Sequence, residues 1–117
     1  MEIKKVGVVG CGLMGAGIAQ AAVTAGFPVT VLETEQRLLE KGFANISRSL
    51  ARLANKGSLG EDPAVVSGRL QGTLSHKDLA DCDIIVEAIV ENVDAKKKLF
   101  ATLDSIAKPD AIFATNT

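Results

Sequence analysis

One glycine-rich turn constrains the fold of this chain more than any other feature. Gly10, Gly12 and Gly15 follow the spacing Gly-x-Gly-x-x-Gly. An apolar, strand-like stretch at residues 3–9 precedes the turn, and residues 13–25 after it are helix-prone and rich in small side chains. The turn therefore joins a strand to a helix, which is how a βαβ unit begins.

Each glycine of this turn has a mechanical reason. Gly10 permits the tight turn, Gly12 lets the backbone approach a pyrophosphate, and Gly15 allows the helix to pack closely on the strand. The N-terminus of the helix then offers unpaired N–H groups and a favourable dipole to phosphates. A glycine turn without a ligand is the alternative, but the flanking strand and helix favour a dinucleotide site.

An acidic residue follows at the expected place. Residues 29–32 predict a second strand that ends at Glu33. In dinucleotide-binding folds a carboxylate about 20 residues after the turn accepts hydrogen bonds from the adenosine ribose, and it repels a 2′-phosphate. The first cation after Glu33 is Arg37. We therefore expect NAD rather than NADP, the alternative being an exposed glutamate that starts a helix.

The rest of the chain alternates between helix and strand patterns. Continuously apolar runs at residues 84–86 and 112–114 are typical of parallel strands covered on both faces. The pattern predicts an α/β fold, a doubly wound parallel sheet of the Rossmann type. After the second strand we expect a helical hairpin, made of helices at 35–56 and 62–67 with a break at 57–60. We further expect strands at 70–74, 83–89 and 111–115, a helical turn at 78–80 and a helix at 94–107.

Composition excludes several kinds of partner. A net charge of −1 and only four aromatic residues, all Phe, argue against nucleic acid. The sequence shows neither a secretory leader nor an apolar run of about 20 residues, so we expect a cytoplasmic protein away from membranes. Cys11 and Cys82 match no zinc or redox spacing, so no metal site is expected. The single domain ends at Thr117 after an apolar strand, which predicts a truncated piece that self-associates through an uncovered edge.

Some chemically capable side chains have plainer interpretations. Cys11 would lie at a helix N-terminus, where a thiol pKa can fall, but a small filler is the better interpretation. The only histidine, His76, lies in a polar turn before the fourth strand, and we expect it on the surface away from the ligand edge. Glu87 and Glu91 lie at and just past the end of the fourth strand, on the ligand edge. Residues 96–98 are all lysine, which is typical of a solvated helix face.

The chain resembles the 3-hydroxyacyl-CoA dehydrogenase family from residue 3 to its end. Residues 12–20 (Gly-Leu-Met-Gly-Ala-Gly-Ile-Ala-Gln) are similar to the family's dinucleotide loop. Residues 83–92 resemble its fourth strand and the following loop, and residues 114–117 resemble its Asn-Thr-Ser segment, one residue short of the serine. The loop alone is shared with many dehydrogenases, whereas the three segments together are specific.

The resemblance implies the NAD-binding domain (residues 1–117) of an enzyme that oxidises 3-hydroxyacyl-CoA, of the short-chain 3-hydroxybutyryl-CoA type. The family's catalytic histidine, its orienting glutamate and its helical dimerisation domain would lie beyond Thr117. The catalytic residues are then absent from this chain, which we expect to be inactive alone, and the parent enzyme would be a homodimer. By this resemblance Ser49 and Lys56 contact coenzyme A. The implied NAD-binding residues are Gly10, Gly12, Leu13, Met14, Gly15, Ala16, Gly17, Glu33, Glu91 and Lys96.

Two other functions remain open from the sequence. One is a 3-hydroxyisobutyrate or 6-phosphogluconate type of dehydrogenase, which shares the Gly-x-Gly-x-Met-Gly pattern. The long stretch between Glu33 and Leu70 argues against it, because that group lacks the helical hairpin. The other is a non-catalytic module that senses NAD and controls a partner.

Overall fold

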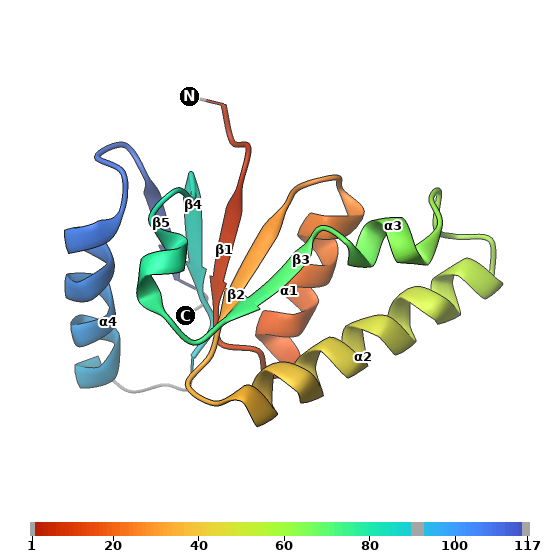
Figure 1. The fold of residues 1–117 in the computed structure, drawn as a ribbon, viewed down its shortest axis with the longest axis horizontal. Helices are drawn as coiled ribbons and strands as arrows, with labels where there is room; N and C mark the ends of the chain where they lie inside the picture. Colours follow the sequence, from red (N-terminus) through yellow and green to blue (C-terminus); the bar gives the residue numbers. More distant parts are fainter. Residues whose placement is uncertain (1, 90–92, 116–117) are drawn as a thin grey trace.

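The computed structural model describes residues 2–89 and 93–115, which form one parallel sheet with helices on both faces (Figure 1). The strand order is β3-β2-β1-β4-β5, so the order reverses beside β1 and the sheet is doubly wound, as predicted. The strands are β1 (Val6–Val9), β2 (Val29–Leu32), β3 (Leu70–Thr73), β4 (Ile84–Glu87) and β5 (Ile112–Thr115). The helices are α1 (Leu13–Thr24), α2 (Gln36–Asn55), α3 (Pro63–Ser67), the 3₁₀ turn η1 (His76–Leu79) and α4 (Val93–Ile106).

The two faces of the sheet carry separate apolar cores. Helices α1, α2 and α3 cover one face, and η1 and α4 cover the other. On the first face Val8 and Val31 pack against residues such as Leu50 of α2. On the second face Ile85 packs against residues such as Leu103 of α4. Because side chains alternate along a strand, burying both faces requires the continuous apolar runs seen in the sequence.

The predicted helical hairpin after β2 is confirmed. Helix α2 turns its apolar side inward and ends near Gly57, whose φ of 70° is a left-handed conformation suited to glycine. Helix α3 begins where the Asp62 side chain accepts a hydrogen bond from the Ala64 N–H at 2.9 Å. Arg69 then ties the hairpin back to α1 by donating to the Val23 carbonyl at 2.9 Å.

Two strand boundaries differ by two or more residues from those predicted, and three others differ by one residue. The first strand begins at Val6 rather than residue 3, because the N–H groups of Lys4 and Lys5 donate to the Asp83 side chain, at 2.8 and 2.9 Å. The fourth strand ends at Glu87 rather than residue 89, because the Glu87 carboxylate accepts the Ile89 N–H at 2.7 Å and turns the chain. In both places a side chain takes a backbone group away from the strand ladder.

The carboxyl ends of the parallel strands meet at one edge of the sheet. Helices α1, α2 and α4 all begin at this edge, which is the lower edge in Figure 1. Ligands of open α/β sheets bind outside the carboxyl ends of the strands, beside the point where the strand order reverses. The sheet therefore brings the glycine-rich turn, Glu33 and the end of β4 to one place.

Candidate dinucleotide-binding site

The conformation of the turn requires two of its three glycines. Gly10 has a φ of 98°, and a Cβ there would lie 2.8 Å from the Ala88 carbonyl oxygen. A Cβ on Gly15 would lie 1.9 Å from the Gly10 carbonyl oxygen. Real Cβ atoms do not approach so closely, so the turn needs glycine at both positions to bring helix α1 against the strand ends.

Gly12 is different, because a Cβ there would meet no protein atom within 4 Å. The protein itself gives no reason for glycine at this position, whereas a ligand lying against the backbone would. Gly12 is the N-cap of α1, and no described side chain caps this helix or places an acid in its first turn. The N–H groups of that turn, which belong to Leu13, Met14 and Gly15, therefore face an anion-binding position.

The beginning of α1 also leaves apolar surface uncovered. Leu13 is 88% exposed and Met14 is 57% exposed, whereas Ala16 is buried against the sheet. Gly17, on the following turn, would meet nothing within 4 Å if it carried a Cβ. This side of the helix can accept a ligand without rearrangement of the protein.

Glu33 lies beside the glycine-rich turn. One carboxylate oxygen, Oε2, accepts the Cys11 N–H at 2.8 Å, and Oε1 accepts the Thr34 N–H at 2.8 Å. These bonds fix the carboxylate at the end of β2, and the Thr34 hydroxyl lies within 3.5 Å of Oε1 as a weaker second donor. Oε2 keeps a second lone pair, which suits a hydroxyl group of a ribose.

Cys11 is a buried spacer between the turn and helix α2. Burial, and then the negative charge of Glu33, raise the pKa of its thiol to about 11. The thiol is therefore protonated and unreactive at neutral pH, which agrees with its interpretation as a small filler. Helix α2 packs onto it at Gly42, where a Cβ would lie 2.1 Å from Cys11 Sγ.

An apolar pocket of about 520 Å³ opens between the ends of β1 and β2 and helix α4. This volume lies within the range of small-molecule sites. Its walls combine the turn and Glu33 with residues that the sequence did not single out. The lining residues are Val9, Gly10, Leu32, Glu33, Thr34, Leu74, His76, Ile89, Ala95, Lys98, Leu99 and Thr102.

The expectation for His76 was wrong in one respect. Its side chain is exposed, as expected, but it lines the same pocket as Gly10 and Glu33 rather than lying away from the ligand edge. His76 starts η1 directly after β3, and the carboxyl end of β3 lies at the same edge as that of β2. The sequence signal for the location of His76 is the direction of β3, the strand that precedes it. The position of His76 before the fourth strand is not informative.

Glu87 and Lys96 form a buried ion pair at this edge. Glu87 is 1% exposed and Lys96 is 9% exposed, and their Oε1 and Nζ atoms lie 3.4 Å apart. Burial by itself raises the pKa of the Glu87 carboxyl, but its hydrogen-bond donors and the nearby ammonium together hold the pKa below its usual range. The solvated-face interpretation is therefore wrong for Lys96, whereas Lys97 and Lys98 are exposed as expected, Lys98 at the lining of the apolar pocket. Glu91 lies outside the described residues.

Ser49 and Lys56 lie apart from this pocket, on helix α2. The Ser49 hydroxyl accepts a hydrogen bond from Gln20 Nε2 of α1 at 2.8 Å. Lys56 is exposed at the C-terminal end of α2, two helical turns further on. Residues at this spacing share one helix face about 10 Å apart, a span that a long, phosphate-bearing ligand can bridge.

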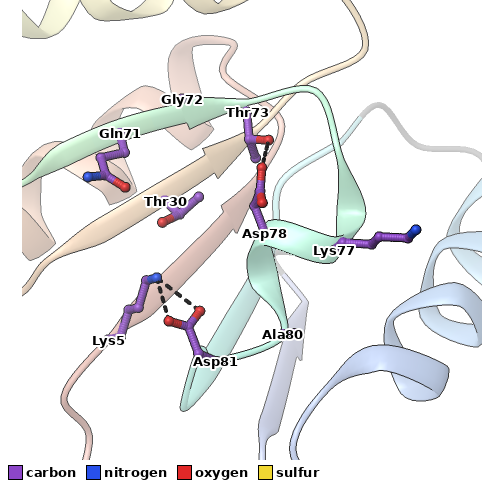
Figure 2. A pocket seen from close by; sticks show the side chains of 9 residues that line it. All are labelled: Lys5, Thr30, Gln71, Gly72, Thr73, Lys77, Asp78, Ala80 and Asp81. Atoms are coloured by element: carbon purple, nitrogen blue, oxygen red, sulfur yellow. Dashed lines mark hydrogen bonds and ion pairs between the residues drawn. The ribbon is translucent and has the colours of Figure 1, made fainter.

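A second, polar hollow of about 340 Å³ lies on the sheet face beside η1 (Figure 2). The charged side chains that face it have partners, and Lys77 points away from it. Lys5 Nζ lies 2.8 Å from Asp81 Oδ2, and the Thr73 hydroxyl donates to Asp78. No residue of the glycine-rich turn lines this hollow. Among residues 2–89 and 93–115, no group of His, Cys, Asp or Glu is arranged to hold a metal ion, and no helix is long and apolar enough to cross a membrane.

These features define a class of protein. A doubly wound parallel sheet, a glycine-rich turn whose helix N-terminus faces open space, and a carboxylate held at the end of β2 together make a dinucleotide-binding α/β domain. Residues 5–117 match the family model described as "3-hydroxyacyl-CoA dehydrogenase, NAD binding domain". The chain belongs to this family, as the resemblance implied.

Curated relatives and solved structures agree with the family model. The chain is 48% identical over 113 residues to a probable 3-hydroxybutyryl-CoA dehydrogenase of Deinococcus radiodurans, covering 97% of this chain and 41% of that protein. It superposes on the (S)-3-hydroxybutyryl-CoA dehydrogenase of Ralstonia eutropha with a TM-score of 0.93 at 40% identity, covering 99% of this chain and 41% of the other. FadB2 of M. tuberculosis gives a TM-score of 0.95 at 39% identity, with 100% and 42% covered. The chain thus spans about two fifths of the length of these relatives.

Proposed function

We propose that this chain is the NAD-binding part of an enzyme that oxidises a short-chain 3-hydroxyacyl-CoA to the 3-oxoacyl-CoA. The observation that carries the proposal is the fixed Glu33 carboxylate beside the glycine-rich turn, at the rim of the apolar pocket. The 3-hydroxybutyryl-CoA dehydrogenases among the relatives support the choice of substrate. When bound, NAD supplies the hydride acceptor of the reaction.

The residues of this chain would hold the cofactor along the carboxyl edge of the sheet. The first-turn N–H groups of α1 bind the pyrophosphate, and Gly12 and Gly17 leave room for it. Glu33 accepts hydrogen bonds from the adenosine ribose, and the apolar pocket takes the adenine ring. Lys96, and Glu91 from the family resemblance, contact the cofactor beyond β4.

The substrate would bind along helix α2. Ser49 and Lys56 are oriented by a helix that packs on the glycine-rich turn, so they can hold the coenzyme A part of the substrate at a fixed distance from the cofactor. The base that removes the hydroxyl proton would come from outside residues 1–117. His76 does not take this role, because it lies on the adenosine side of the site.

The same features support a proposed cellular setting for the enzyme. The buried free cysteines Cys11 and Cys82 suit a reducing compartment, and bacterial relatives favour the cytoplasm, although some plant relatives are named peroxisomal. We further propose a homodimeric parent enzyme that takes acyl-CoA as its partner and needs neither nucleic acid nor a membrane.

Calorimetric titration with NAD and NADP tests the cofactor assignment. The unmodified chain should bind NAD and discriminate against NADP. Glu33→Ala should weaken NAD about tenfold or more by removing charge-assisted hydrogen bonds, and should relax the discrimination by removing a repulsive charge. Glu35→Ala is the matched control, because Glu35 is an exposed glutamate of the same loop, paired with Arg37. Equal binding of NADP and NAD by the unmodified chain would refute the assignment.

A further inference from the structure

The buried pair of Glu87 and Lys96 carries a large desolvation penalty. Lys96 lies in the first turn of α4, where the positive end of the helix dipole opposes a cation. Both side chains are almost fully removed from water, and a buried ion pair often gives no more stability than apolar residues of the same volume. Stability alone therefore gives no reason for this pair.

Glu87 is held by hydrogen bonds in addition to its contact with Lys96. Residues Glu87 and Thr115 are partners in the register of β4 and β5, and the Thr115 hydroxyl donates to Glu87 Oε1 at 2.7 Å. The other oxygen, Oε2, accepts the Ile89 N–H at 2.7 Å. The carboxylate thus joins the end of β4, the tip of β5 and the start of α4 at one point.

This point lies at the carboxyl edge, on the half of the sheet opposite Glu33. In a doubly wound sheet the two halves bind the two halves of the dinucleotide, so β4 and β5 face the reactive half. We propose that Glu87 is a positioning residue of the cofactor site: held by Ile89 and Thr115, it keeps the ammonium of Lys96 oriented toward NAD. The inference rests on the proposed contact between Lys96 and NAD.

The same strand provides a matched control. Asp83 lies just before β4, at its opposite end, and is also buried. It too accepts backbone N–H groups, from Lys4 and Lys5, and pairs with a lysine, Lys108. Asp83→Asn therefore removes a comparable carboxylate with comparable partners, but far from the cofactor edge.

A double-mutant cycle tests whether Glu87 acts through Lys96. NAD affinity is measured by calorimetry for the unmodified chain, Glu87→Gln, Lys96→Met and the double variant, with thermal unfolding of each. Glu87→Gln keeps the size of the side chain and should weaken NAD about tenfold, the value of one charge-assisted hydrogen bond. In the Lys96→Met background the same change should leave NAD affinity unaltered. Asp83→Asn should lower the unfolding temperature and leave NAD affinity within about twofold of that of the unmodified chain.

NMR of the lysine side chains keeps the inference testable even where a variant does not fold. In the unmodified chain, addition of NAD should shift the ammonium signal of Lys96 and leave that of Lys108 unchanged. An unshifted Lys96 signal in NAD-bound protein would overturn the inference.

The cycle has further outcomes that would overturn it. A tenfold loss that persists without Lys96 would show a general structural effect, and unchanged or tighter NAD binding by Glu87→Gln would show that Glu87 does not position Lys96. Each of these leaves the NAD assignment standing. Failure of the unmodified chain to bind NAD would overturn the proposed function, and this inference with it.

Discussion

Substitution of Gly42 by alanine should destabilise the protein, although alanine is the better helix former. Gly42 lies inside helix α2, where a glycine-to-alanine change alone contributes about 1 kcal/mol of stability. In the structure, however, the new Cβ would lie 2.1 Å from Cys11 Sγ and 2.7 Å from the Cys11 carbonyl oxygen. The second atom belongs to the backbone of the glycine-rich turn, so α2 or the turn must move.

The size of the effect follows from these two opposing contributions. Overpacking typically costs about 1–3 kcal/mol, and contacts this short with backbone belong at the upper end. After subtraction of the helix propensity, we expect a net loss of about 1–2 kcal/mol. For a domain of this size the loss corresponds to a fall of about 4–8 °C in Tm.

Gly17→Ala is the matched control for Gly42→Ala. Gly17 also lies inside a helix, α1, but a Cβ there would meet nothing within 4 Å. This variant should gain about 0.5–1 kcal/mol in stability and lose NAD affinity if the cofactor approaches the helix there. Thermal and urea unfolding measure both variants. In a Cys11→Ala background Gly42→Ala should cost less, since the thiol is gone and the carbonyl remains. Unchanged or raised stability of Gly42→Ala would refute the close approach of α2 to the turn.

Three further predictions concern the substrate, acid stability and association. In an enzyme of this family that carries this domain, Lys56→Ala should raise the acyl-CoA KM modestly at low salt and leave NAD affinity nearly intact; an unchanged KM would count against the coenzyme A contact. The hydrogen bond from Lys108, and then those from the N–H groups of Lys4 and Lys5, lower the pKa of Asp83 to about 2. The ionised Asp83 therefore contributes its full stabilisation above about pH 4, and this stabilisation is lost as the pH falls toward 2. Asp83→Asn should flatten the dependence of Tm on pH in that window, and a pH profile that Asp83→Asn leaves unchanged would contradict this. Strand β5 is an edge of the described sheet and Ile112 on it is 43% exposed, so the chain should self-associate, and light scattering that shows only monomer at high concentration would disprove it.

The fold could be predicted from sequence because its signals are local. The glycine spacing, the apolar strand runs and the long amphipathic helix each depend on residues close together in the chain. The first strand begins late because of a long-range contact, since nothing near Lys4 in the sequence indicates that Asp83 accepts its N–H. The fourth strand ends early because of a local one, the bond from the Ile89 N–H to Glu87. The fold was therefore predicted well, and the ends of two strands were not.

The site was predicted less completely, because part of it depends on how the helices and strands pack together. Glu33 could be identified because its position depends on its distance from the turn along the chain. The burial of Lys96 could not, because three neighbouring lysines look alike until the crossover from β4 to α4 turns one of them toward Glu87. The direction of β3 indicates that His76 lies at the pocket, whereas its position before β4 does not.

Cys11 shows how the long-range contacts prepare the site for its ligand. Its N–H donates to Glu33 at the end of β2, and its side chain lies under Gly42 of α2. The residue between the first two glycines is therefore held by the strand that ends at the ribose-binding carboxylate and by the helix that carries the proposed coenzyme A contacts. A turn fixed from both sides loses little conformational freedom when it receives a pyrophosphate, so less of the binding energy is spent on ordering it. Any change that lifts α2 from Cys11 should therefore weaken NAD binding and lower the stability of the protein. This holds even though no residue of α2 (Gln36–Asn55) lines the apolar pocket.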